Sequence, residues 1–104
     1  MLRIYETMRT MLTHLRPVLE HLDRRDPDLA RQLRRAATSI LLNTAEGMYS
    51  RGKNRTSRYH TALGSARETL ACLEVAEALY SMPINTTLRT ELDAILDTLV
   101  RLVA

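Results

Sequence analysis

The sequence predicts an all-α protein, an antiparallel up-down-up-down four-helix bundle, and two observations carry this prediction. Leu, Ala, Ile, Val and Met supply most of the apolar residues, while Phe and Trp are absent from the 104-residue chain. Four segments repeat apolar residues at alternating spacings of three and four, which places each set on one face of a helix. Residues 1–104 have the length of a single domain.

Each predicted helix contributes one apolar face to the core. The first face consists of Ile4, Met8, Met11, Leu15, Val18 and Leu22, and the second of Leu29, Leu33, Ala36 and Ile40, followed in phase by Asn43 and Gly47. The third consists of Tyr59, Leu63, Ala66, Leu70, Leu73 and Tyr80, and the fourth of Leu88, Leu92, Ile95, Leu99 and Leu102. The short connections between these segments require neighbouring helices to run antiparallel.

Capping residues and prolines predict where the helices begin and end. Asp26-Pro27 suits the N-cap and first position of the second helix. The polar run 50–54 predicts the turn before the third helix. Pro83 ends the third helix and Asn85 can start the fourth. Pro17 lies within the first apolar face, so we expect a kink or an irregular turn there.

Basic residues concentrate in the middle of the chain. Seven lie between residues 31 and 58 against one acid, which gives this segment a charge of +6 although the whole chain carries +3. Arginine outnumbers lysine fourteen to one, and guanidinium groups suit bidentate contacts with phosphate. We therefore predict a surface that binds RNA or DNA phosphates with little sequence preference. Its candidate residues are Arg31, Arg34, Arg51, Lys53, Arg55 and Arg58. The alternative is a solvated face that only keeps the bundle soluble.

A polar stripe on the second helix matches one on the third. With the turn centred on Gly52, antiparallel partners have numbers that sum to about 104, which sets Ser39 against Ser65. We expect a structural polar seam that fixes the alignment of the two helices, with Gly64 allowing close backbone approach. Its members are Arg35, Ser39, Asn43, Glu46, Ser65 and Glu68, with Arg35 near Glu68 and Glu46 near Arg58. The alternative, an acid–base site at Glu46 or Glu68, lacks a second group.

Other chemistry has little support in the sequence. His14 and His21 share a helix face but lack the spacing of metal ligands. Cys72 lies among apolar residues and fits a small buried hydrophobe better than a reactive thiol. No glycine-rich phosphate loop is present. We therefore expect no catalytic residue, no metal site and no cofactor, and the chain is not predicted to be an enzyme.

Cysteine usage and leftover apolar residues predict the compartment and the assembly. A single cysteine, with no secretory signal and no bilayer-spanning stretch, predicts a cytoplasmic protein without a membrane partner. Six apolar residues lie beside the core faces, namely Leu12, Leu19, Leu42, Val75, Leu79 and Val103. A bundle of this size cannot bury all of them, which predicts a homo-oligomer.

Three motifs, QLRRAATSI at 32–40, NTAEG at 43–47 and ALGSARE at 62–68, together resemble the bacterial "four helix bundle protein" family. Members of that family are encoded in intervening sequences of large-subunit ribosomal RNA genes. The resemblance is close over residues 29–80, although Thr44 stands where an aliphatic residue is common. It implies a four-helix bundle that assembles as a homopentamer and is not an enzyme.

The family is related to the accessory variability determinants of diversity-generating retroelements, which bind nucleic acid and a reverse transcriptase. For a chain linked to a retroelement, the resemblance would therefore imply a reverse transcriptase as partner. Taken together, the residues and the resemblance predict a non-catalytic homo-oligomeric bundle that binds RNA or DNA phosphates. The alternative is a helical scaffold for protein–protein interaction.

Overall fold

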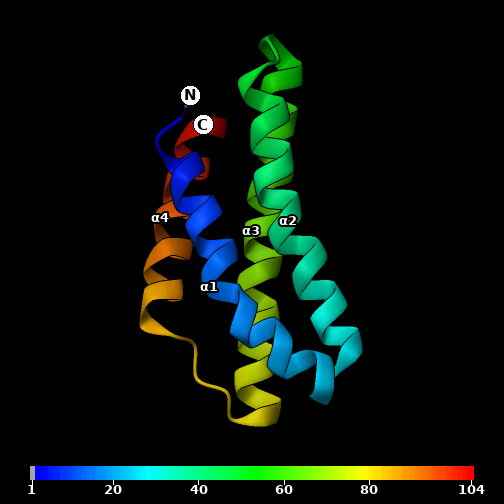
Figure 1. Ribbon diagram of the computed structural model, residues 1–104. Helices are drawn as coiled ribbons and strands as arrows, with labels where there is room; N and C mark the ends of the chain where they lie inside the picture. The colour runs from blue at the N-terminus through cyan, green and yellow to red at the C-terminus, as the bar shows by residue number, and fades with distance from the viewer. Residues whose placement is uncertain (1) are drawn as a thin grey trace.

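The four apolar segments each form one helix in the computed structural model, which describes residues 2–104. The helices are α1 (Ile4–Arg25), α2 (Pro27–Met48), α3 (Gly52–Tyr80) and α4 (Thr86–Val103). They run alternately up and down (Figure 1), and α1 contacts α2 and α4 while α3 contacts the same two helices. The predicted fold class, an antiparallel four-helix bundle, is therefore confirmed.

The core lies where the four predicted faces meet. Its largest fully buried apolar side chains are Met8, Met11, Leu15, Leu22, Leu33, Ile40, Leu88, Leu92, Ile95 and Leu99. Each such side chain contributes about 1.5–3 kcal/mol by leaving water, so this packing dominates the stability of the bundle. Val18, Leu70 and Leu102 are only partly buried and pack at the margin of the core.

Pro17 does not interrupt α1. The helix is continuous from Ile4 to Arg25 with Pro17 inside it, and its axis changes direction along its length (Figure 1). The proline side chain is exposed, so its ring lies away from the core. Because proline lacks the N–H that the preceding turn would bind, a bend at this point has a local cause.

Asp26 joins three helices at the bottom of the bundle. It separates α1 from α2, and its carboxylate accepts a hydrogen bond from the Leu29 amide at 3.1 Å, as predicted for an N-cap. The Tyr80 hydroxyl, at the end of α3, donates to the same carboxylate at 2.5 Å. The Arg25 guanidinium lies 4.7 Å from the centre of the Tyr80 ring. The hydrogen bonds from Tyr80 and Leu29 lower the pKa of Asp26 below its ordinary value.

The connection from α3 to α4 also follows the predicted signals. Ser81 ends α3 in the left-handed conformation with φ of 54°, and Pro83 lies in the extended segment that follows. The Asn85 side chain accepts hydrogen bonds from the amides of Thr87 and Leu88 at 2.8 and 3.2 Å, and so caps α4.

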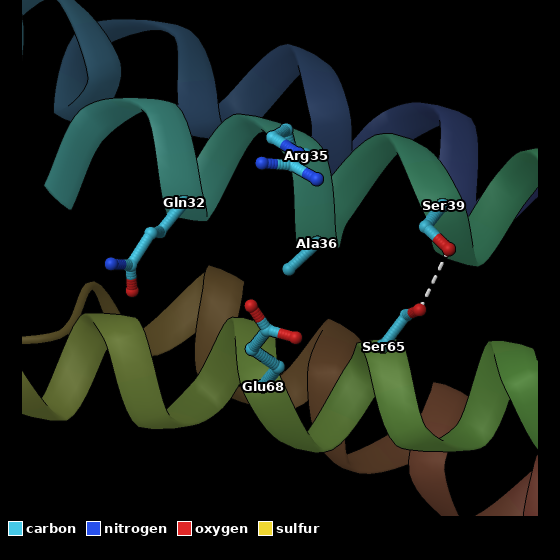
Figure 2. A pocket seen from close by; sticks show the side chains of 6 residues that line it. All are labelled: Gln32, Arg35, Ala36, Ser39, Ser65 and Glu68. Carbon is cyan, nitrogen blue, oxygen red and sulfur yellow. Dashed lines mark hydrogen bonds between the residues drawn. The ribbon is translucent and has the colours of Figure 1, made fainter. Parts of the chain in front are cut away.

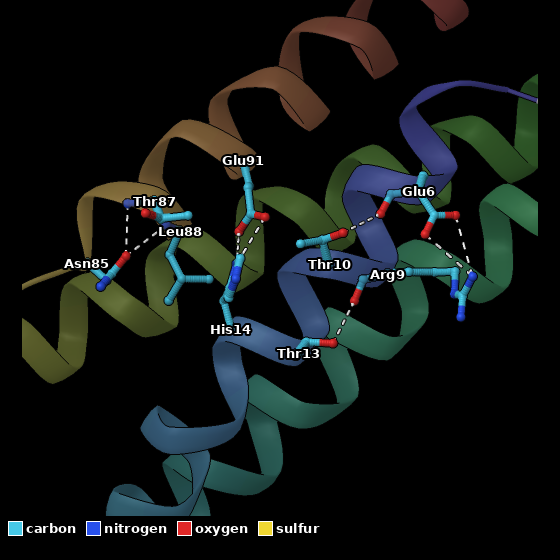
Figure 3. A network of polar contacts seen from close by, with 9 residues as sticks. All are labelled: Glu6, Arg9, Thr10, Thr13, His14, Asn85, Thr87, Leu88 and Glu91. Atoms are coloured by element: carbon cyan, nitrogen blue, oxygen red, sulfur yellow. Dashed lines mark hydrogen bonds and ion pairs between the residues drawn. The ribbon is translucent and has the colours of Figure 1, made fainter.

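Polar contacts join α1 to α4 outside the core. His14 Nδ1 lies 2.9 and 3.1 Å from the two carboxylate oxygens of Glu91, which connects the middle of α1 to α4 (Figure 3). Within α1, Arg9 pairs with Glu6 one turn earlier. Only the His14–Glu91 contact reinforces the packing of α1 against α4 that the core residues already make.

The leftover apolar residues divide into two groups. Leu12, Leu19 and Val103 pack against the core and are partly buried. Leu42 and Leu79 are 61% and 64% exposed, and Val75 is exposed as well. The bundle therefore covers half of the predicted set and leaves the other half in water. No helix within residues 2–104 has the length and apolar composition needed to cross a bilayer.

We predict that Asp26→Ala lowers the melting temperature by several degrees, because it removes both the cap of α2 and the acceptor for Tyr80. Since the folded pKa of Asp26 is lowered, its carboxylate stabilises the fold above the unfolded pKa near 4. This contribution is lost as the pH falls through the folded value. Circular dichroism melts across acidic pH measure both effects.

Asp28→Ala is the matched control, because Asp28 lies in the first turn of α2 but is exposed and pairs only with Arg31. It should change the melting temperature much less than Asp26→Ala does. Equal melting temperatures for Asp26→Ala and the unchanged protein, with the same acid dependence, would contradict the role given to Asp26.

Candidate functional site

The polar seam runs between α2 and α3. The Ser65 hydroxyl donates to the Ser39 hydroxyl at 2.7 Å, the pairing expected from the summed residue numbers (Figure 2). The Asn43 side-chain amide donates to the backbone carbonyl and the hydroxyl of Ser39, both at 3.0 Å. The Arg58 guanidinium donates to the side-chain oxygen, Oδ1, of Asn43 at 3.4 Å. A chain of polar contacts thus connects the two helices and fixes their alignment.

Next to the serine pair, the two helices border a groove of about 340 Å³. Its lining residues are Gln32, Arg35, Ala36, Ser39, Ser65 and Glu68. Arg35 from α2 and Glu68 from α3 extend into the groove from opposite sides (Figure 2). Both are exposed, and neither forms an ion pair within residues 2–104. They therefore lie near one another, as the spacing predicts, without a direct bond.

Glu46 lies outside the seam. Its side chain is exposed and makes no ion pair with Arg58 in the described part of the chain; the sequence predicts that the two residues lie near one another, and that proximity stays a prediction. The ion pair is absent because of the packing at this level, where the buried Tyr59 ring fills the interface against Gly47 and leaves Glu46 on the solvent side. Arg58 bonds to Asn43, one turn earlier in α2, instead.

The glycine that permits close approach is Gly47 and not Gly64. A Cβ atom at Gly47 would lie against Cε1 of Tyr59 and only 2.8 Å from its Cδ1. At Gly64 a Cβ atom would meet nothing within 4 Å, and the residue is exposed. The prediction for Gly64 is therefore wrong, because this position of α3 faces solvent and not α2.

The six predicted basic residues fall into two groups, two that pair with acids within residues 2–104 and four that do not. Arg31 pairs with Asp28, and Arg34 pairs with Asp23 of α1 at 3.1 Å. Both acids precede residue 31, so a charge count over 31–58 leaves them out. At about 1.5 Å per helical residue, Arg34 lies roughly 25 Å along the helix axis from Arg51. Arg31 and Arg34 therefore lie far from the α2–α3 turn, and each already has an acidic partner.

The remaining four basic residues gather at the α2–α3 turn. We define the hairpin end as residues 49–58, which contain Arg51, Lys53, Arg55 and Arg58. In Figure 1 the α2–α3 turn projects past the neighbouring ends of α1 and α4. All four basic side chains are exposed, and none pairs with an acid within residues 2–104. The hairpin end thus presents unneutralised positive charge to solvent.

Arg55 holds the hairpin end together. Its Nε donates to the carbonyl oxygens of Gly47 and Ser50 at 3.2 and 2.9 Å. The Gly47 carbonyl belongs to the last turn of α2, where the aligned peptide dipoles leave partial negative charge, and the Ser50 carbonyl lies in the turn that follows. The Arg55 guanidinium satisfies these acceptors and offsets their charge. Arg55 therefore has a structural role besides its contribution to the basic surface.

The start of α3 adds further positive potential to the same end. Its N-cap, Arg51, makes no side-chain hydrogen bond to the helix, and the first turn contains no acid. The first amides of α3 therefore lack a side-chain acceptor, and they carry the partial positive charge of a helix N-terminus. Gly52 allows the sharp reversal before the helix, with φ of 56°.

Two tyrosines flank the turn in the sequence, but only one reaches the surface. Tyr59 is buried against Gly47, whereas Tyr49 is 87% exposed. Their burial differs because Tyr59 lies on the apolar face of α3, whereas Tyr49 follows the last residue of α2 and has no helix face to pack. Tyr49 is not among the predicted binding residues. Its position next to a basic turn is the sequence signal that could have identified it.

Neither a reactive cysteine nor a metal site is indicated within residues 2–104. Cys72 is buried, and its pKa is raised first by this burial and then by the nearby charge of Glu68. A raised pKa keeps the thiol protonated, which opposes reactivity. Within residues 2–104 no group of three or more His, Cys, Asp and Glu side chains is arranged to hold a metal ion.

A family model described as "23S rRNA-intervening sequence protein" matches residues 1–102. The chain belongs to this family. The crystal structure of an S23 ribosomal protein family member from Bacteroides thetaiotaomicron, described as a protein with unknown function, is similar with a TM-score of 0.82. The two chains are 16% identical, and the match covers 96% of this chain and 97% of that one. At this identity the likeness shows the fold alone. No curated protein matches the chain.

Membership in the intervening-sequence family confirms the resemblance carried by the three motifs. It also agrees with the observed fold, since the structural neighbour spans all four helices. Neither match names a retroelement protein, and that relation stays a prediction.

We predict opposite effects for alanine at the two helical glycines. Gly47→Ala should lower the free energy of unfolding by about 1–3 kcal/mol, because the new methyl group collides with the Tyr59 ring. Gly64→Ala should raise it by about 0.5–1 kcal/mol, because alanine favours the helix and the position is open. Urea unfolding of both variants measures the difference. Equal effects would show that α2 does not approach Tyr59 at Gly47.

Proposed function

We propose that this member of the intervening-sequence family is a cytoplasmic, non-catalytic homo-oligomer that binds RNA or DNA phosphates through its hairpin end. The observation that carries the proposal is the group of four exposed basic side chains on a projecting turn, with no acidic partner among the described residues. Such a surface gains affinity by releasing the counterions that surround nucleic acid. Contacts of this kind recognise the backbone and carry little sequence information.

The family description supports RNA as the first ligand to test, since it refers to 23S rRNA. The uncapped start of α3 supports a polyanion more generally, because free helix amides favour phosphate oxygens. Arginine predominates at this end, and a guanidinium can donate two parallel hydrogen bonds to one phosphate.

The homo-oligomer is supported by the exposed apolar residues. Val75 and Leu79 lie one turn apart on α3, and Leu42 lies on α2. A second groove between these two helices adds apolar lining from Leu29 and Val75. We propose a pentamer, the assembly that the family resemblance implies. A closed ring would bring five hairpin ends together and multiply the positive potential.

The non-catalytic part of the proposal is supported by the seam. The hydroxyls of Ser39 and Ser65 bond to one another, so neither is activated by a base. Glu68 faces Arg35 across an open groove, and an exposed carboxylate of this kind lacks the burial that tunes a general acid.

We predict that binding of a labelled RNA of mixed sequence weakens steeply with salt. If one hairpin end neutralises about four phosphates, log affinity should fall with log salt at a slope of about −3 to −4. Fluorescence anisotropy at several salt concentrations measures this slope. The absence of any binding at low salt would contradict the proposed function.

Two matched pairs of substitutions locate the binding surface. Arg51→Gln with Lys53→Gln should reduce affinity about tenfold or more and make the slope shallower by about 2. Arg31→Gln with Arg34→Gln changes the charge equally but affects residues already paired with acids, so it should leave affinity nearly unchanged. The reverse order of effects would place the binding surface on α2. Arg55 is left intact because it caps α2.

The assembly has its own test. Light scattering should give a mass several times that of the 11.9 kDa protomer, with five copies expected. Val75→Glu with Leu79→Glu should lower this mass, because it places charge on the exposed apolar part of α3. A stable monomer for the unchanged protein would contradict the assembly.

A protein-interaction scaffold is the second candidate, and one observation favours it. The two grooves between α2 and α3 share Gln32 and Glu68, so they adjoin one another and offer a partner protein a surface along both helices. A scaffold would capture its partner equally well after Arg51→Gln with Lys53→Gln. A reverse transcriptase is the partner to test if the gene lies beside one.

A further inference from the structure

Tyr49 makes no visible contribution to the fold. At 87% exposed, it is the most exposed large apolar side chain of the described residues. By contrast, Tyr59 is buried, Tyr80 bonds to Asp26 and Tyr5 is partly buried. An aromatic ring stabilises a protein mainly by leaving water, so a ring left in water has no structural reason for its size.

The backbone that carries this ring is held in place. The Tyr49 amide donates to the carbonyl oxygen of Glu46 at 3.3 Å, and the Ser50 hydroxyl donates to the same oxygen at 2.7 Å. Arg55 bonds to the carbonyls of Gly47 and Ser50 from the other side of the turn. Because the turn is already ordered, a ligand that contacts the ring loses little conformational freedom of the chain.

Positive charge lies within reach on the same turn. Arg51 follows two residues after Tyr49, so their Cα atoms are at most about 7 Å apart. Lys53 is exposed in the first turn of α3. Proteins that bind single strands combine an aromatic ring, which stacks on an unpaired base, with cations on the same segment that contact the flanking phosphates.

We infer that Tyr49 stacks on an unpaired base, and that the hairpin end prefers single-stranded nucleic acid to a duplex. The inference rests on the proposed binding of nucleic acid by this end. In a duplex the faces of the bases are covered by their neighbours, so only the phosphates remain available to the turn. In a single strand the ring and the cations act together, and the base adds to the affinity.

Fluorescence anisotropy with three probes tests this inference: an oligouridylate of about ten nucleotides, a blunt duplex of equal length and an abasic strand. Tyr49→Ala should weaken binding of the oligouridylate about 5- to 150-fold, the range reported by alanine substitution for one stacked base. It should leave the abasic strand unaffected, since that strand has no base, and should affect the duplex far less than the oligouridylate, since only the two terminal base pairs of a duplex have an open face. Tyr49→Phe keeps the ring and should bind as the unchanged protein does. DNA probes show whether the ribose matters.

A fluorescence reporter gives a second, independent readout. The chain has no tryptophan, so Tyr49→Trp introduces a single indole at the turn. Oligouridylate should quench this indole, and the duplex should not. Val100→Trp is the matched control, because Val100 is also an exposed apolar residue but lies on α4, outside the hairpin end. Its indole should not respond to either probe.

The outcomes separate this inference from the proposed function. Equal binding of all three probes by the unchanged protein and Tyr49→Ala would overturn the stacking role and leave phosphate binding intact. No binding of any probe at low salt would overturn both. A change in oligomeric mass on Tyr49→Ala, with binding unchanged, would assign the ring to a contact between subunits and also overturn the inference.

Discussion

The packing of α2 against α3 is the constraint on which the rest of the structure depends. The two helices are joined by a turn of three residues, and the Ser39–Ser65 hydrogen bond fixes their alignment. Near the turn, Gly47 lets the Tyr59 ring fill the interface, which a larger residue would prevent. Because α3 has 29 residues while α4 has 18, this pair extends beyond the other helices and carries the hairpin end into solvent (Figure 1).

Electrostatics at the hairpin end follow from the same geometry. An antiparallel turn brings the negative C-terminal end of one helix beside the positive N-terminal end of the next. Arg55 offsets the first, while no side chain within residues 2–104 caps the second. The exposed charges of Arg51 and Lys53 then add to a field that is already positive. At the opposite end of α2, Asp26 acts as the N-cap and Arg31 pairs with Asp28 in the first turns of the helix. The bundle is therefore electrically different at its two ends.

Local patterns predicted most of the fold, because periodicity and capping depend on neighbours in the chain. The core faces and the caps at Asp26 and Asn85 were accessible in this way, and the short turn near Gly52 allowed the same counting to predict the serine pairing across α2 and α3. Contacts between helices without such a short turn count were not accessible: Arg34 pairs with Asp23 of α1, an acid outside the segment over which the basic charge was counted. Of the candidate site, the turn was predictable, but its separation from the paired arginines was not. Thr44 is buried, and its hydroxyl has no hydrogen-bond partner within residues 2–104, a feature that no local pattern predicted.

The central claim is that the hairpin end is where ligand meets the bundle, and amide hydrogen–deuterium exchange with and without RNA tests it most directly. The account predicts slower exchange on RNA addition at residues 49–58, with little change in α1 and α4. Slower exchange confined to the α2–α3 groove around Gln32 and Glu68, or no change at the hairpin end when RNA is bound, would contradict it.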